Sequence, residues 1–146
     1  MVGTIGAVGI PLQDVGLAVK RLQWRHHREA NHRLSPLGLS LVQWDVLRHL
    51  AAQPEASLHD LAVLTFQTDQ SMGALATRMI RRGLLDRVQG PGRAVRHRLT
   101  EQGEDARRAG GELMDAVLRE SFGALTPQQV DQLHELLTLT AQGDVP

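Results

Sequence analysis

Hydrophobic positions recur every three or four residues along most of the chain, which predicts a largely helical protein. The first helix is predicted over residues 12–33, with four apolar residues at helical spacing: Leu12, Val15, Val19 and Leu22. A second helix is predicted to begin at Ser40, where Gln43 completes a capping box, and to end at 53–54. Its apolar residues are too many for one stripe, so we expect burial on more than one side.

Two shorter helices follow, separated by a tight turn. Ser57 with Asp60 three residues later predicts the start of the first. Residues 65–67 form the turn, and Thr68 is the expected N-cap of the next helix. Gly83 is expected to end that helix in a left-handed conformation. This is the order of a helix-turn-helix unit.

A short antiparallel hairpin is predicted next, with strands over 84–88 and 95–99 and a loop rich in glycine over 89–94. Side chains alternate along a strand, so the second strand has two faces. One face carries Val95, His97 and Leu99, and the other carries Arg96 and Arg98. We expect His97 to pack against the domain.

The rest of the chain reads as two helices. Thr100 is the expected N-cap of a long helix reaching about Ser121, with an interruption or kink at 110–111, where two glycines are adjacent. Thr126 followed by Pro127 begins the last helix. Its apolar face consists of Val130, Leu133, Leu136 and Leu137.

Composition bounds the class of protein. The chain of 146 residues fits one domain over 1–146, is 42% hydrophobic and has no cysteine. No stretch has the length of a membrane span, so we expect a soluble cytoplasmic protein that does not contact a membrane. There is no phosphate loop, nucleophile elbow or carboxylate pair, and His26, His27 and His32 lack metal-ligand spacing. We therefore expect no enzyme activity, metal or cofactor.

Charge is distributed unevenly although the formal net charge is zero. Opposed only by Asp86, a basic patch over residues 78–98 holds Arg78, Arg81, Arg82, Arg87, Arg93, Arg96 and Arg98. A local patch of this kind is what meets a phosphate backbone, so double-stranded DNA is the favoured partner.

The helix after the turn has two contrasting faces. Its core stripe is Met72, Leu75, Ala76, Met79 and Ile80. The opposite face is small or polar near its start and cationic near its end, which suits a helix entering the major groove. An ordinary solvated face, with arginines placed by the helix dipole, is the alternative. The arginines of the hairpin favour DNA, and the candidate contacts are Thr68, Gln70, Ser71, Ala74, Thr77, Arg78, Arg81, Arg93, Arg96 and Arg98.

Four segments together resemble the MarR family of regulators. They are LVQWDVLRHLA (41–51), SLHDLA (57–62), RMIRRGLLDRV (78–88) and GRAVRHRLTEQG (92–103). There are two departures from the family pattern. Pro91 stands where the wing commonly has an aspartate, and residues 68–71 read Thr-Asp-Gln-Ser where Asp-Arg-Ser-Thr is frequent. The resemblance covers about residues 37–103.

The resemblance implies a mainly α winged helix-turn-helix over 37–103 with a two-stranded β wing, flanked by dimerisation helices over 12–33 and 104–140. It implies a homodimer on a palindromic operator, acting as a repressor. It also implies release by a small-molecule effector, which is often aromatic in other members, and by position the candidate contacts are Trp24, His27, Arg28, Asn31 and Trp44. These five are alternatively core and surface residues. The flanking helices could also pack within a monomer, and the domain could bind proteins and not DNA.

Overall fold

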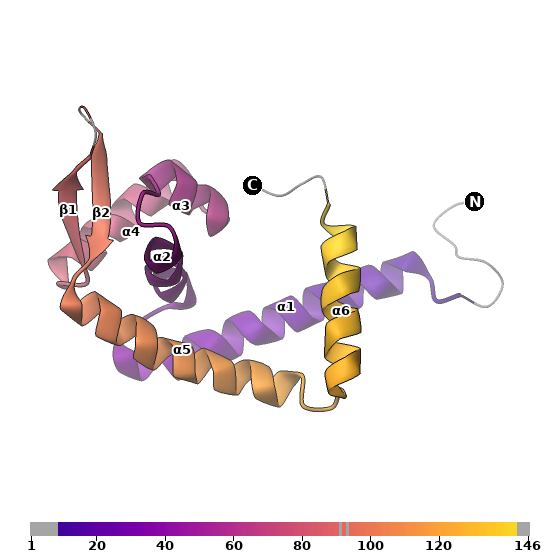
Figure 1. Ribbon diagram of the computed structural model, residues 1–146. Helices are drawn as coiled ribbons and strands as arrows, with labels where there is room; N and C mark the ends of the chain where they lie inside the picture. Colours follow the sequence, from indigo (N-terminus) through magenta and orange to yellow (C-terminus); the bar gives the residue numbers. More distant parts are fainter. Residues whose placement is uncertain (1–8, 91, 93, 143–146) are drawn as a thin grey trace.

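The computed structural model describes residues 9–90, 92 and 94–142 and has the predicted order of elements (Figure 1). The fold is mainly helical with a single two-stranded sheet in the described part. The elements are α1 (Leu12–Leu34), η1 (Ser35–Leu37), α2 (Leu41–Ala52), α3 (Leu58–Leu64), α4 (Asp69–Arg81), β1 (Leu85–Gln89), β2 (Val95–Leu99), α5 (Glu101–Ser121) and α6 (Pro127–Thr140). The predicted winged-helix class is confirmed.

The helix starts follow from their capping residues. The side chains of Ser40, Ser57 and Thr126 each accept from a backbone N–H three residues on and complete a capping box. Thr68 and Thr100 cap α4 and α5 in the same manner without the reciprocal bond. All five starts were predicted from the sequence, because a cap depends only on residues within one turn.

The core lies where α2, α3, α4 and the hairpin meet, closed by the end of α1 and the middle of α5. The predicted α4 stripe is buried, except for Ile80, which is half-buried. The largest side chains of the core are fully enclosed: Leu34, Leu47, Leu50, Leu61, Met72, Met79 and Leu85. Packing of this density holds α4 firmly from its inner side and leaves its outer side free.

The first strand starts one residue later than predicted, at Leu85 instead of Leu84. Leu84 is buried, and its carbonyl accepts the Thr100 N–H at 3.1 Å, so it anchors the start of α5 and does not pair with β2. The strands are antiparallel, with Arg87 opposite His97 and Asp86 opposite Arg98. Residues opposite one another share a face of the sheet, so Arg87 lies on the His97 face.

Helix α5 continues through Gly110 and Gly111, so the predicted interruption is wrong. Gly110 is buried where α5 crosses α2, and a Cβ there would overlap the Trp44 ring and lie 2.9 Å from its Nε1. The Trp44 Nε1 donates to the Arg107 carbonyl at 3.0 Å. The glycine therefore permits the close packing of α5 on α2.

Helices α1 and α5 pack along one another beneath the winged helix, and α6 stands across α1 at the far end from the wing (Figure 1). The first half of α1 and all of α6 contain no buried residue. Their exposed apolar side chains are Leu12, Val15, Leu17, Val19, Val130, Leu136, Leu137 and Leu139. None of the described helices combines the length and apolar character that a membrane span needs.

Candidate nucleic-acid interface

The outer face of α4 is a continuous exposed surface. Gln70, Ser71, Ala74, Thr77, Arg78 and Arg81 are all exposed. Thr68 caps the helix, and its hydroxyl also donates to the Ser71 hydroxyl oxygen at 3.0 Å. The Thr77 hydroxyl donates to the Gly73 carbonyl at 3.0 Å, so its oxygen remains available as an acceptor. The start of the face thus offers hydroxyls and an amide, and the end offers guanidinium groups.

Arg78 and Arg81 have no carboxylate within 4.0 Å in the part of the chain that the structure describes. Their guanidinium groups can therefore bind an added anion without breaking an ion pair. The neighbouring Arg82 differs, because its Nη1 donates to the Gly38 carbonyl oxygen.

Hollows flank α4 on both sides. One of 370 Å³ lies toward the start of α2 and includes Ser71, Ala74 and Arg78. On the other side, a hollow of 320 Å³ toward the sheet and α3 includes Gly73, Thr77, Arg87 and Val95. Helix α4 therefore forms a ridge between two depressions, a shape that fits a groove with raised edges.

Arg87 belongs to this surface, although it was not among the sequence candidates. It is exposed on the His97 face of the sheet and lines a further hollow of 300 Å³ together with Thr77 and Arg81. No carboxylate of the described chain lies within 4.0 Å of it. The strand register would have placed it there, because Arg87 pairs with the inward-facing His97.

His97 is buried, as predicted, with 3% of its surface exposed. Burial lowers the pKa of His97 below its ordinary value of 6.5, and the Arg87 charge lowers it further. The imidazole is therefore neutral at pH 7 and acts as a core side chain behind the wing.

Arg96 and Arg98 lie on the other face of the sheet from Arg87 and His97, because side chains alternate along β2. Arg98 Nη2 lies 4.0 Å from Asp86 Oδ2 across the hairpin, in an exposed pair. Arg96 is half-buried, and its Nη1 donates to the Val95 carbonyl at 3.4 Å. These two arginines thus do not share the surface of Arg78, Arg81 and Arg87, and Arg93 and Pro91 lie outside the described residues.

The five residues suggested as ligand contacts do not line one hollow. Trp24 is 58% exposed and stacks on His27 with ring centroids 5.9 Å apart, and Arg28 is exposed. The Asn31 Oδ1 accepts the Leu41 N–H at 2.8 Å, and Trp44 packs between α2 and α5. Asn31 and Trp44 therefore hold helices together, because tertiary contacts occupy their polar atoms.

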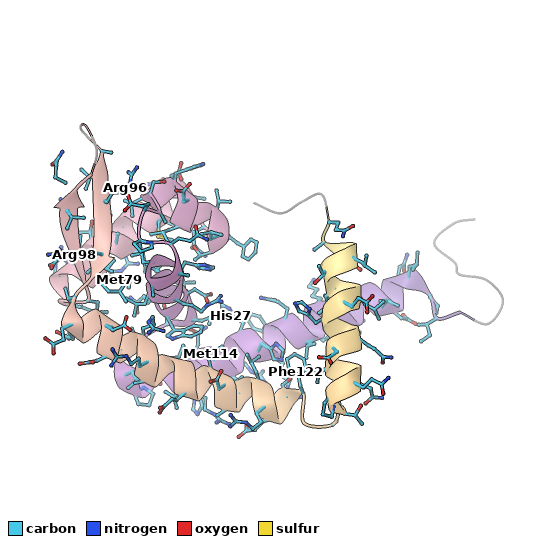
Figure 2. The ribbon with its side chains drawn as sticks, in the orientation of Figure 1. His27, Met79, Arg96, Arg98, Met114 and Phe122 are labelled. Atoms are coloured by element: carbon cyan, nitrogen blue, oxygen red, sulfur yellow. The ribbon has the colours of Figure 1, made fainter. Side chains whose placement is uncertain are left out.

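An apolar hollow of 460 Å³ lies instead between α1 and α6, and His27 is the one candidate that lines it. Phe122 closes it at the end of α5, beside the first turn of α6 (Figure 2). Its other polar members are Gln23 and His26. The spacing of Val15, Val19 and Leu22 was the sequence signal for this surface, but that stripe does not reveal which helix lies opposite.

His26 joins this hollow to α5. Its Nε2 lies 2.6 Å from the Ser121 Oγ, and its ring meets Phe122 edge-to-face at 5.2 Å. Burial, followed by the Arg25 charge, lowers the pKa of His26. Among the described residues, no three His, Cys, Asp or Glu side chains gather as a metal site would require.

The sequence and the fold were compared with those of known proteins. Residues 37–94 match the family model described as MarR family, whereas no curated protein sequence matches the chain. A MarR-family transcriptional regulator from Rhodococcus sp. RHA1 is 23% identical with a TM-score of 0.81, over 90% of this chain and 96% of that one. A variant of MarR from E. coli, solved with operator DNA, is 21% identical with a TM-score of 0.78, over 87% and 93%.

A third similar structure is a MarR-family protein of Mycobacterium tuberculosis, solved in complex with p-aminosalicylic acid. It is 24% identical with a TM-score of 0.75, over 88% of this chain and 98% of that one. The family match covers the helix-turn-helix and β1 and ends before β2, and the structural matches extend to the flanking helices. Residues 37–94 are therefore similar to the MarR family, and the chain shares the fold of these solved structures.

Proposed function

We propose that this protein is a DNA-binding transcriptional regulator that binds a palindromic operator as a homodimer and represses transcription. The observation that carries the proposal is the outer face of α4, where polar side chains lead to Arg78 and Arg81, which have no carboxylate partner among the described residues. Hydroxyl and amide groups bond base edges, and guanidinium groups bind guanine or phosphate.

The shape of the surface supports the same proposal. A B-DNA major groove admits an α-helix, and the two hollows beside α4 leave space for the groove edges. Arg87 lies beside Arg81 on the sheet side, in position for a phosphate. The structure of the E. coli relative was solved with operator DNA, which adds support from the same fold.

Dimerisation is supported by the exposed apolar side chains of α1 and α6. Leu136 is 61% exposed, and α6 has no buried residue. A second copy covering these helices would remove that apolar surface from water. A two-fold dimer presents two copies of α4, which suits an operator with two-fold symmetry.

We propose further that a small aromatic effector binds in the hollow between α1 and α6 and releases the operator. The hollow adjoins the proposed dimer interface, because Val15, Val19 and Leu137 belong to both surfaces. The hollow is lined mainly by aliphatic side chains, and Gln23, His26 and His27 supply the polar atoms. Binding there would change how α1 and α6 pack and thereby favour one spacing of the two α4 helices. One of the similar proteins was solved with p-aminosalicylic acid, a small aromatic molecule, which supports an aromatic effector.

The test is retention of genomic DNA fragments on the tagged protein at moderate salt, followed by sequencing. We expect one enriched palindrome, and an affinity that falls about 10³- to 10⁵-fold between 50 and 200 mM salt if six to ten phosphates are contacted. A folded protein that retains no fragment would support the alternative of a winged helix that binds proteins. A site overlapping a promoter would support repression over activation.

Matched variants locate the interface. Arg81→Ala is expected to weaken operator binding and to reduce the slope of log K against log salt by about 1. Arg93→Ala tests the wing and should weaken binding with little change in melting temperature. Arg98→Ala is the control, because Arg98 lies on the other face of the sheet beside Asp86. Equal losses in all three would argue against an interface centred on α4.

A further inference from the structure

Three arginines lie at the end of α4, and the side chain of one of them forms a hydrogen bond within the protein. Arg78 and Arg81 have no carboxylate partner in the described part of the chain, whereas the Arg82 guanidinium donates through Nη1 to the carbonyl of Gly38. Gly38 lies 44 positions earlier, between η1 and α2. This bond therefore joins the end of α4 to the loop that follows α1.

Both ends of this bond have fixed backbone geometry. Gly83 has φ +79°, and the N–H groups of Gly83 and Leu84 donate to the Ile80 and Met79 carbonyls, which gives a complete helix C-cap. Gly38 has φ +71°, and its N–H donates to the Ser35 carbonyl at 2.8 Å. A Cβ on Gly38 would lie 2.5 Å from Arg82 Nη2, so the glycine also makes room for the guanidinium.

The loop that Arg82 holds is attached to α1 from its other side. The Asn31 Oδ1 of α1 accepts the Leu41 N–H at 2.8 Å, and Leu39 between the two attachments is buried. Helix α1 is in turn fixed to α5 by His26 with Ser121 at 2.6 Å and by the exposed Arg33–Glu120 pair at 2.5 Å. Arg82 thereby connects α4 to the paired helices α1 and α5.

A second connection reaches the same end of α4 from α5. The Thr100 hydroxyl donates to the Gly83 carbonyl at 2.6 Å, and Gln102 Nε2 donates to the Arg82 carbonyl at 3.4 Å. A helix end held at one point can pivot, whereas one held at two separated points keeps its direction. Removal of the Arg82 bond would leave the α5 connection as the remaining side-chain attachment described here at this end of α4, in addition to the core packing of its inner face.

We propose that Arg82 is a positioning residue for operator binding, which holds α4 at a fixed angle to α1 and α5 and does not contact DNA. The inference rests on the proposed function, since the angle matters only if α4 reads DNA. In a dimer built on α1 and α6, this angle sets the direction in which each α4 meets its half-site. Loss of the bond would widen the range of orientations that α4 adopts relative to α1 and α5. A smaller fraction of molecules would then have the orientation that binds the operator.

The experiment compares four variants on the palindromic duplex selected from genomic DNA, over a range of salt concentrations and well below each melting temperature. Arg82→Ala removes the bond together with a charge, and Arg82→Lys keeps a charge and a donor. Gly38→Ala disturbs the bond without removing any charge, because its Cβ would lie 2.5 Å from Arg82 Nη2. It also strains the backbone at φ +71°, so its melting temperature is measured beside that of Arg82→Ala. Arg81→Ala is the matched control for a phosphate contact.

We expect Arg82→Ala and Gly38→Ala to weaken binding about tenfold with an unchanged salt slope, and Arg82→Lys to restore part of the loss. Arg81→Ala should weaken binding and reduce the slope by about 1. An Arg82→Ala slope reduced by about 1 would make Arg82 a phosphate ligand and overturn the proposal. Unchanged affinity would overturn it as well, and a role in folding stability alone would lower the melting temperature without changing affinity.

Amide hydrogen exchange on the DNA-free protein supplies a readout that does not depend on DNA. The Leu39 and Leu41 amides should exchange faster in Arg82→Ala and Gly38→Ala and remain unchanged in Arg81→Ala. Unchanged exchange in all variants would show that the bond does not hold the loop. If the wild-type protein binds no duplex, both the proposed function and the role of Arg82 in operator binding are contradicted. The exchange data would still show whether Arg82 holds the loop at Gly38.

Discussion

At the scale of single residues, the arginines of the basic patch have different surroundings although they look alike in the sequence. Arg78, Arg81 and Arg87 lack a carboxylate partner in the described chain, Arg98 lies near Asp86, and Arg82 binds a backbone carbonyl. A guanidinium carries the same charge in every case, but its neighbours decide whether it can bind phosphate. Counting arginines therefore indicated a DNA interface without identifying its members.

The buried His97 gives a testable dependence of stability on pH. Burial first and the Arg87 charge second lower the pKa of His97 in the folded protein, so the unfolded chain binds the proton more readily. This group therefore leaves the free energy of unfolding unchanged well above the ordinary pKa of 6.5 and reduces it as pH falls below that value. Urea unfolding at a series of pH values measures the slope.

His97→Gln should flatten part of that slope. The other histidines contribute to the slope with both signs. Burial lowers the pKa of His26 and of His49, whereas the hydrogen bond that His59 Nδ1 donates to Asp69 raises the pKa of the exposed His59. Identical slopes for His97→Gln and wild type would contradict the assignment of His97 as a buried neutral side chain.

At the scale of elements, local signals predicted the described α-helices and strands to within a residue or so, but not the short 3-10 helix η1. Capping residues set the helix starts, and Gly83 with φ +79° sets the end of α4. Two expectations failed for the same reason: Leu84 joins the start of α5 and not the strand, and Gly110 does not interrupt α5. In both positions a contact with a distant element overrides the local preference.

The crossing of α2 and α5 is expected to depend on Gly110. Gly110→Ala should reduce the free energy of unfolding by about 1–3 kcal/mol, because the added methyl overlaps Trp44 in a close-packed contact. Thermal or urea unfolding measures the change, and the fluorescence of Trp44 should shift with it.

The neighbouring glycine provides the control for this prediction. Gly111→Ala meets Trp44 Cζ2 at 3.9 Å, an ordinary contact, so it should be neutral or stabilise by about 0.5–1 kcal/mol through helix propensity. Equal effects of the two substitutions would show that helix propensity and not packing decides this crossing.

At the scale of the whole molecule, the middle of the chain forms a packed domain, whereas the helices near the two ends of the chain, α1 and α6, expose apolar side chains. The winged helix has a closed core, whereas α6 and the first half of α1 contain no buried residue. An exposed apolar surface on long helices is typical of an interface between subunits. The proposed dimer would place its contacts on α1 and α6 and leave both α4 helices free.

Replacing Leu133 and Leu136 with Asp is expected to break the proposed dimer and to lower the melting temperature, because charges would be buried against a second copy. Light scattering coupled to size exclusion measures the mass. Gln128→Asp with Thr138→Asp adds equal charge off the apolar face and should leave the dimer intact. A stable dimer in the Leu133 and Leu136 variant would place the interface elsewhere.

The sequence by itself determined the helices, the hairpin, the inward stripe of α4 and the polar character of its outer face. These depend on capping, turn chemistry and periodicity, which act over a few residues. Only the tertiary structure decided that Arg87 joins the α4 surface, that Arg82 holds Gly38, and that Asn31 and Trp44 pack between helices. Those roles depend on which distant element lies opposite each side chain, and only the packing of the whole chain sets that arrangement.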